Sequence, residues 1–293
     1  MPFGYENYRL KNGISPKTVV NEVSLIQSFL KFVDEYYNRS VAPHEIRPID
    51  VKNFLDIQRK KPIKDSTVNR KLVYIRVWFN YMWEQGKIPV DFMEKFKYDV
   101  LDLTPKTHKI TLNYFELLSK RDNVYKNSEM PLNAKLFFLF DLRGMRRRDT
   151  LGVTIKDITD LGDELNVLVE TRDGTATFNL THPGEISVLL QAIERAVFRD
   201  TQYLFTVKKK DQYLQEQLSS SSATNKALAK VLGFNLHSEV VRFAYVHYLH
   251  IAKQAKLEEI QELLGTTRER AANILKEALV RVNNVDYNMQ RTS

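Results

Sequence analysis

The feature that most constrains this chain is an apolar repeat with the period of an α-helix, which returns several times in the first hundred residues. Its clearest copy follows Ser15 and Pro16, a pair typical of a helix start. The apolar residues then recur at spacings of four and three: Val19, Val23, Ile26, Leu30, Val33 and Tyr37. A strand would instead alternate with a period of two. The repeat predicts an amphipathic helix and a fold that is mainly α.

Two more helices are expected in the same region. One follows Pro48 and ends in the basic run from Arg59 to Lys64, because Pro62 cannot continue a helix. Another begins near Ser66, which can cap it, and is ended by Gly86. The apolar side of this last helix is formed by Val68, Leu72, Ile75, Phe79 and Met82. These residues predict a helical domain.

A polar, basic stretch at residues 104–109 separates this region from the rest of the chain. A chain of 293 residues is also longer than the roughly 100–200 residues of a typical domain. Since linkers between domains are commonly polar and contain proline, we expect two domains, 1–105 and 106–293.

The second domain is predicted to be mostly helical with a small antiparallel sheet. Helices are expected from Asn113 and from Leu132 to Leu142, and β-branched residues around Asp173-Gly174 predict a hairpin within 164–181. Everything after the hairpin is expected to be helical, with Ser219 to Ser222 as a polar loop and cap. The expected helices are 184–198, 222–232, 236–253, 257–264 and 267–283.

Composition favours a polyanionic partner and excludes several kinds of site. Lys and Arg number 44 against 36 Asp and Glu, a net charge of +8, although solvated surface lysines would give the same balance. The absence of cysteine excludes disulfides, thiol nucleophiles and Cys-ligated zinc. The sequence has no Walker A, GxGxxG, HExxH or GxSxG motif and no apolar run of membrane-spanning length. No metal, cofactor or membrane is expected, and the expected location is the cytoplasm.

Residues 144–158, GMRRRDTLGVTIKDI, carry the most informative pattern. They resemble the first arginine box of the tyrosine recombinases, the phage integrase family, in which Gly-x-Arg precedes an acidic residue and an Asp-Ile pair. The residues in register are Gly144, Arg146, Asp149, Leu151, Asp157 and Ile158. Residues 242–249 resemble the helix of the family's second arginine, and Leu264-Gly265 resembles its Leu-Gly turn. Residues 66–70 resemble the start of the last helix of its core-binding domain.

The resemblance implies a helical core-binding (SAM-like) domain followed by a mostly helical catalytic-type domain with a small antiparallel sheet. In the family, two arginines hold the scissile phosphate, a hairpin lysine acts as general acid and a tyrosine attacks. Arg146 and Arg242 stand at the arginine positions. Arginine forks suit this task because they neutralise the charge of the phosphate oxygens.

Four other catalytic positions depart from the family pattern. The hairpin offers Thr171 or Arg172 in place of lysine, and Glu239 stands where a histidine would face the phosphate. Thr266 replaces His or Trp after the Leu-Gly turn, and Leu275 occupies the place of the nucleophile. Leucine cannot attack phosphorus, and the nearest later tyrosine is Tyr287.

The expected function is therefore sequence-specific binding of double-stranded DNA without recombinase activity, as a transcriptional repressor of a phage or another mobile element in the nucleoid of a bacterial host. The alternative is an active recombinase that uses Arg146, Arg242 and a displaced Tyr287. A third hypothesis is an accessory protein that bridges DNA or binds a recombinase or regulatory partner. The C-terminal helix is a candidate surface for homo-oligomer formation.

The expected DNA contacts come from both domains: Lys60, Lys61, Lys64, Arg70, Lys71, Arg146, Arg147, Arg172 and Arg242. Competing interpretations remain open for most of them. The cluster at 146–148 could pair with Asp141 and Asp149, Arg242 could pair with Glu239 three residues before it, and the basic run at 59–64 could be a solvated face. Lys208 to Lys210 could be only a soluble edge. The phenylalanines at 137, 138 and 140 and the histidines at 247 and 250 are interpreted as structural residues.

Overall fold

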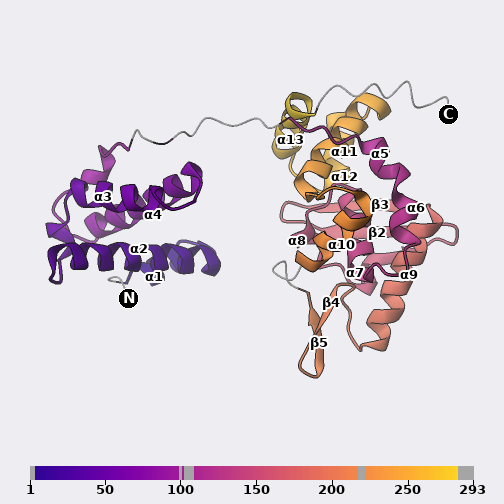
Figure 1. Cartoon of the computed structure of the whole chain (residues 1–293), viewed down its shortest axis with the longest axis horizontal. Coiled ribbons are helices and arrows are strands. Elements are labelled where there is room, and N and C mark those ends of the chain that lie inside the picture. Colours follow the sequence, from indigo (N-terminus) through magenta and orange to yellow (C-terminus); the bar gives the residue numbers. More distant parts are fainter. Residues whose placement is uncertain (1–3, 99–100, 102–108, 217–221, 283–293) are drawn as a thin grey trace. The chain divides into compact units, whose positions relative to one another are not determined.

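The computed structural model describes residues 4–98, 101, 109–216 and 222–282, and these form two compact units, Met1–Lys106 and Thr107–Ser293 (Figure 1). Each unit has its own hydrophobic core. The predicted linker falls largely on residues 102–108, which lie outside the described residues.

The first unit consists of helices, as the apolar repeats predict. They are α1 (Tyr5–Lys11), α2 (Pro16–Tyr37), α3 (Pro48–Arg59) and α4 (Asp65–Glu84), with 3-10 turns at Pro43–Glu45 and Phe92–Glu94. The predicted cap of α2 is confirmed, since the Ser15 side chain accepts a hydrogen bond from the Thr18 amide at 3.3 Å. The prediction for Ser66 is wrong. Lys64 is the last extended residue before α4, so Ser66 lies inside the first turn, behind Asp65, whose carboxylate suits a helix N-terminus.

The largest fully buried side chains in the core of the first unit are aromatic and include Phe29, Trp78 and Phe79. Helix α1, which the sequence does not predict, adds the buried Tyr5 to this core. It is held to α2 by Arg9, which donates to the buried Glu22 at 2.8 and 2.9 Å, and by a 2.8 Å hydrogen bond from Tyr5 to the same carboxylate.

The second unit is mostly helical. Its first half contains α5 (Tyr114–Ser119), α6 (Arg121–Tyr125), α7 (Leu132–Asp141) and α8 (Arg147–Thr150), a 3-10 turn at Ile155–Asp157, and strands β1 (Ile158–Asp160), β2 (Leu165–Glu170) and β3 (Thr175–Leu180). Its second half contains α9 (Pro183–Phe198), β4 (Thr206–Lys209), β5 (Gln212–Gln215), α10 (Ser222–Leu232), α11 (Ser238–Lys253), α12 (Leu257–Leu264) and α13 (Arg268–Arg281).

The predicted hairpin is confirmed as β2 and β3 of a three-stranded antiparallel sheet with the order β1-β2-β3. Alternate residues of both strands are buried, and Val167 pairs with Phe178 across the strands. The expectation that everything after this hairpin is helical is wrong for residues 206–215, which form a second hairpin, β4–β5. Its strands bury little, so the sequence lacks the alternation by which strands are recognised.

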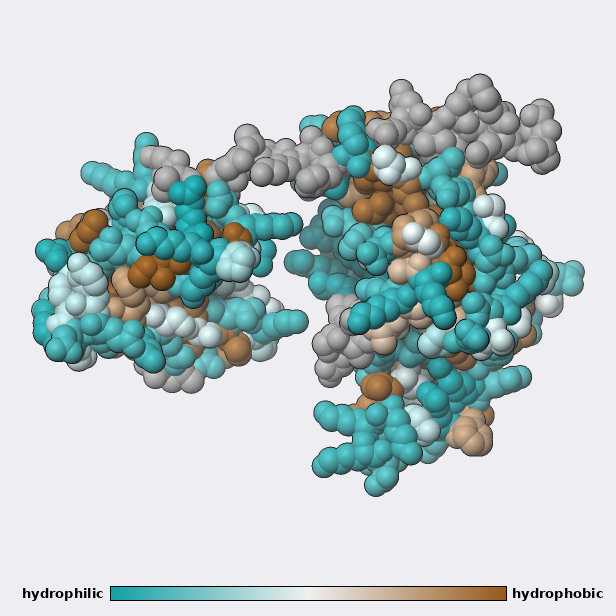
Figure 2. Space-filling model, in the orientation of Figure 1, coloured by the Kyte–Doolittle hydropathy of each residue, from teal (hydrophilic) through white to brown (hydrophobic). Residues whose placement is uncertain are grey.

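Helix α7 lies at the centre of the second core. Phe137, Phe138 and Phe140 are all buried, which agrees with their structural interpretation, and His247 is buried in α11. Along the described residues, no helix is both long and apolar enough to cross a membrane. Figure 2 shows that much of the surface of each unit in this view is hydrophilic.

Candidate nucleic-acid interface

The fold brings Arg146 and Arg242 to one cavity of the second unit. Arg146 is the residue before α8, and Arg242 lies in the second turn of α11. Both line a cavity of about 260 Å³, together with Met145, Ser238, Glu239, Phe243 and Ile274. Arg146 is half-buried, whereas Arg242 is only 8% exposed. Two arginines nearly one hundred residues apart in the chain therefore share one small site.

The electrostatics of this cavity favour an anion. Burial, and next the positive charge of Arg146, lower the pKa of Arg242 to about 10, while Asp149 and more weakly Asp173 and Glu239 oppose this shift. Even so, the guanidinium remains charged at neutral pH. Its Nε is buried and has no hydrogen-bond partner among the described residues. A phosphate oxygen would supply that partner and relieve the repulsion between the two cations.

Gly144 allows the turn between α7 and α8 to pass directly against α11. Its φ is +65°, a left-handed conformation that favours glycine. A Cβ there would lie 2.9 Å from Tyr245 and 3.5 Å from the Cγ of Arg242. Gly144 thus allows the turn that precedes Arg146 to pack closely against the helix that carries Arg242.

Two buried ion pairs fix the same turn on either side. Arg143 donates to Glu185 at 2.5 and 3.1 Å, and Arg147 donates to Asp141 at 2.7 Å. Both carboxylates are fully buried. Pattern reasoning identifies the Asp141 pair as an alternative but misses Glu185, because that residue lies 42 positions from its partner.

Arg147 is therefore engaged inside the unit. It is 8% exposed and also contacts Asn225 and, at 5.0 Å, the ring of Phe137. Burial raises the pKa of Asp141 to about 6 in spite of the paired guanidinium. Arg148, in contrast, is exposed and lies 3.5 Å from Asp149. Arg147 therefore has a structural role within the unit, and Arg146 and Arg242 are the arginines that line the cavity.

Glu239 lines the cavity without forming the ion pair with Arg242 that is the alternative interpretation of that arginine. It is exposed, and within the described ranges no ion pair joins it to Arg242. Its carboxylate nevertheless acts on Arg242 electrostatically. The cavity thus has two arginines and one carboxylate that competes with an incoming phosphate.

The turn of the β2–β3 hairpin is fastened to the α12–α13 turn. The Thr171 hydroxyl donates to the Gly265 carbonyl, and Arg270 pairs with Asp173. The backbones touch so closely that a Cβ at Gly265 would lie 2.4 Å from the Ala176 nitrogen. The Thr171 hydroxyl therefore forms a hydrogen bond within the protein, while Arg172 is exposed at the turn.

The remaining catalytic positions of the family hold a buried threonine, a leucine and a tyrosine that lies outside the described residues. Thr266 is buried and its hydroxyl has no hydrogen-bond partner in the described part of the chain. Leu275 is partly buried and packs against the core of the second unit. Tyr287 lies outside the described residues.

In the first unit, the expected DNA contacts lie at the α3–α4 connection and along α4. Lys60, Lys61, Lys64 and Arg70 are exposed. Lys71 is partly buried and donates to Gln58 at 2.6 Å. Burial, and next the charge of Lys61, lower the pKa of Lys71. The four exposed cations remain available to a partner, whereas Lys71 links α4 to α3 through its hydrogen bond to Gln58.

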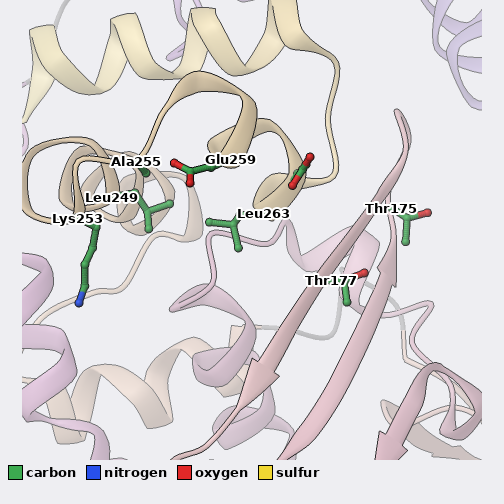
Figure 3. A pocket seen from close by; sticks show the side chains of 8 residues that line it. Thr175, Thr177, Leu249, Lys253, Ala255, Glu259 and Leu263 are labelled. Carbon is green, nitrogen blue, oxygen red and sulfur yellow. The ribbon is translucent and has the colours of Figure 1, made fainter.

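A separate cavity of about 660 Å³ lies between β3, α11 and α12 (Figure 3). Thr175 and Thr177 line it from the sheet, and Lys253, Glu259 and Leu263 from the helices. None of the expected DNA contacts lines this cavity.

Comparison with known proteins supports the tyrosine recombinase family. Residues 4–86 match the sequence profile of the phage integrase N-terminal SAM-like domain. The tyrosine recombinase XerC of Syntrophus aciditrophicus (strain SB) is 22% identical over 160 residues, which cover 53% of this chain and 48% of that protein. The matched part thus spans about half the length of this curated relative.

Solved structures of recombinases share the fold. XerH bound to its difH substrate superposes with a TM-score of 0.64 at 17% identity, covering 87% of this chain and 74% of that one. A lambda integrase dimer bound to a COC' core site gives 0.64 at 15% identity, covering 97% and 96%. The Tn1549 transposon integrase with a circular intermediate DNA gives 0.63 at 12% identity, covering 92% of each chain. The predicted fold class, a SAM-like helical domain followed by a mostly helical recombinase-type domain, is confirmed.

Proposed function

We propose that this protein binds double-stranded DNA in a sequence-specific manner without cleaving it, and acts as a transcriptional repressor of a phage or another mobile element. The observation that carries the proposal is the shared cavity of Arg146 and Arg242, in which a buried Nε lacks a partner among the described residues. Recombinases of the same fold that are bound to DNA give independent support.

The lack of cleavage is inferred from the residues at the expected catalytic positions. Leu275 has no nucleophilic atom and packs against the core, and the Thr171 hydroxyl is bonded to the Gly265 carbonyl. Glu239 adds a negative charge where a phosphate would bind. DNA binding needs only cations that contact the phosphate backbone of the DNA, together with contacts to base edges. Cleavage of a DNA strand also needs a nucleophile and a proton donor. The protein would then act by occupying its DNA site and not by cleaving it.

The deciding experiment is a pull-down of genomic fragments by the purified full-length chain, followed by a search for covalently attached protein. The proposal predicts discrete fragments with intact ends, and binding that survives Tyr287→Phe. Enrichment without sequence preference would instead favour an accessory DNA-bridging protein.

The competing function is site-specific recombination through Tyr287, which the retained arginine pair leaves open. A suicide duplex that carries a nick tests it directly, because a recombinase would be trapped on the DNA as a phosphotyrosyl adduct. An adduct that disappears in Tyr287→Phe would overturn the proposal of binding without cleavage.

A further inference from the structure

The β4–β5 hairpin presents a cluster of cations that the arginine cavity does not use. Lys208 and Lys209 end β4, and Lys210 forms the turn with φ at +57°. All three are exposed, and in the described part of the chain no acidic side chain forms an ion pair with them. The hairpin projects from the body of the second unit, and its tip is hydrophilic (Figures 1 and 2).

The base of this hairpin is firmly attached. Arg199 donates to the Thr206 hydroxyl at 2.8 Å, and its guanidinium lies 4.4 Å from the centre of the Tyr213 ring. The Gln215 side chain donates at 2.8 Å to the carbonyl of Leu151, the residue that follows α8. The base of the hairpin that carries the three lysines is therefore held by Arg199 and by Leu151, which lies just after Arg146 and α8 in the chain.

The length of the hairpin suits contacts beyond the arginine cavity. Each strand has four residues, and at about 3.3 Å per residue the tip reaches about 13 Å from the base. Successive base pairs are about 3.4 Å apart, so this reach corresponds to roughly four base pairs. The tip is therefore separated by several base-pair steps from the attachment of the hairpin at Leu151, which favours contacts with phosphates other than those at the arginine cavity.

We propose that the tip of the β4–β5 hairpin binds backbone phosphates of duplex DNA outside the segment held at the arginine cavity. Lysine is a compact charge on a flexible stem, which suits phosphate oxygens better than the two-pronged recognition of a base. The contact therefore adds affinity without sequence preference. This inference rests on the proposed DNA binding and extends the interface to a surface that the family resemblance does not identify.

The test compares two variants of equal charge on a labelled random-sequence duplex. The first carries Lys208→Gln, Lys209→Gln and Lys210→Gln. The control carries Lys126→Gln, Lys230→Gln and Lys253→Gln. These exposed lysines lie apart in the second unit, directly after α6, in α10 and at the end of α11. Loss of three phosphate contacts reduces the slope of log affinity against log salt concentration by about 2 to 3 in the first variant. We expect a much smaller change in the control.

Two further variants separate a DNA contact from a folding defect. Replacing the three lysines by arginine keeps the charge and is expected to keep the affinity. Asp211→Asn removes the carboxylate at the tip and is expected to strengthen binding, a result that misfolding would not produce.

The outcomes distinguish this inference from the proposed function. If the unmodified protein fails to bind DNA, the proposed function itself is wrong. If it binds but the hairpin and control variants lose the same affinity, the contact at the tip is refuted and only net charge matters. A change in the ratio of specific to random-sequence affinity would also refute phosphate binding, because it would indicate that the tip reads bases.

Discussion

Arg146 and Arg147 are adjacent in the chain, but the fold gives them different tasks. Arg146 precedes α8 and lines the cavity, whereas Arg147 points into the unit and pairs with the fully buried Asp141. A buried carboxylate without its partner is costly, so Arg147 contributes to the stability of the unit. Two adjacent arginines thus divide into a proposed binding residue, Arg146, and a structural residue, Arg147.

The first prediction concerns Arg147→Ala. Losing the buried partner of Asp141 is expected to lower the free energy of unfolding by about 3 kcal/mol. The pKa of Asp141 is already raised to about 6 and should rise further without the guanidinium. When the pKa of an acid is higher in the folded than in the unfolded state, the free energy of unfolding falls as pH rises towards the folded-state pKa. The deficit should therefore grow from pH 5.5 to pH 8.

Urea unfolding at the two pH values measures this deficit. Arg148→Ala, at an exposed position, is the control and should leave stability nearly unchanged. A deficit in Arg147→Ala that is equal at both pH values would contradict the role of Asp141.

Glu239→Gln is the second prediction. The substitution keeps the size of the side chain and removes the carboxylate that competes with phosphate at the cavity. Charges about 4 Å apart in water interact by about 1 kcal/mol, so DNA affinity should increase by up to roughly fivefold. Titration of a labelled duplex measures the increase. A loss of affinity would mean that Glu239 positions Arg242 after all.

The third prediction concerns the contact between the turn of the β2–β3 hairpin and the α12–α13 turn. Gly265→Ala combines a left-handed backbone with a Cβ placed 2.4 Å from the Ala176 nitrogen. The backbone conformation alone costs about 1 to 2 kcal/mol, and the clash adds to it.

Gly233→Ala separates these two costs. Gly233 also has a positive φ, +83°, but a Cβ there meets nothing within 4 Å. Thermal unfolding should show a clearly larger loss for Gly265→Ala than for Gly233→Ala. Equal losses would mean that the β2–β3 hairpin moves to accommodate the added Cβ and that the two turns are only loosely attached.

The elements that could be predicted from the sequence are those with one apolar side. Helix α2 and the β2–β3 hairpin bury alternating or periodic residues, which leaves a pattern that can be recognised. Helix α1 escapes because its seven residues bury only Tyr5. The β4–β5 hairpin escapes because its strands are mostly exposed and are defined by backbone pairing.

The candidate site was predictable to the same limited extent. The segments 144–158 and 242–249 identify Arg146 and Arg242 by their resemblance to the family, and the structure brings both arginines to one cavity. Spacing alone could not decide which neighbour of Arg146 would turn inward, since that depends on Asp141 being buried. The support from Glu185 depends on a helix that starts about forty residues later, so local pattern gives no sign of it.

For the whole molecule, the two units offer separate groups of cations to the same proposed partner. The first group is Lys60, Lys61 and Lys64 between α3 and α4, and the second is centred on Arg146. Contacts that release counterions independently have additive effects on the salt dependence of binding.

The last prediction is therefore additive. Replacing Lys60, Lys61 and Lys64 by glutamine should reduce the slope of log affinity against log salt by about 3, and Arg146→Ala by about 1, so the combined variant should lose about 4. The charge-matched control replaces Lys11, Lys17 and Lys31, which are exposed on α1 and α2. If the lysines of the first unit behave like this control while Arg146→Ala keeps its effect, the basic run is a solvated face and the second unit alone binds phosphate.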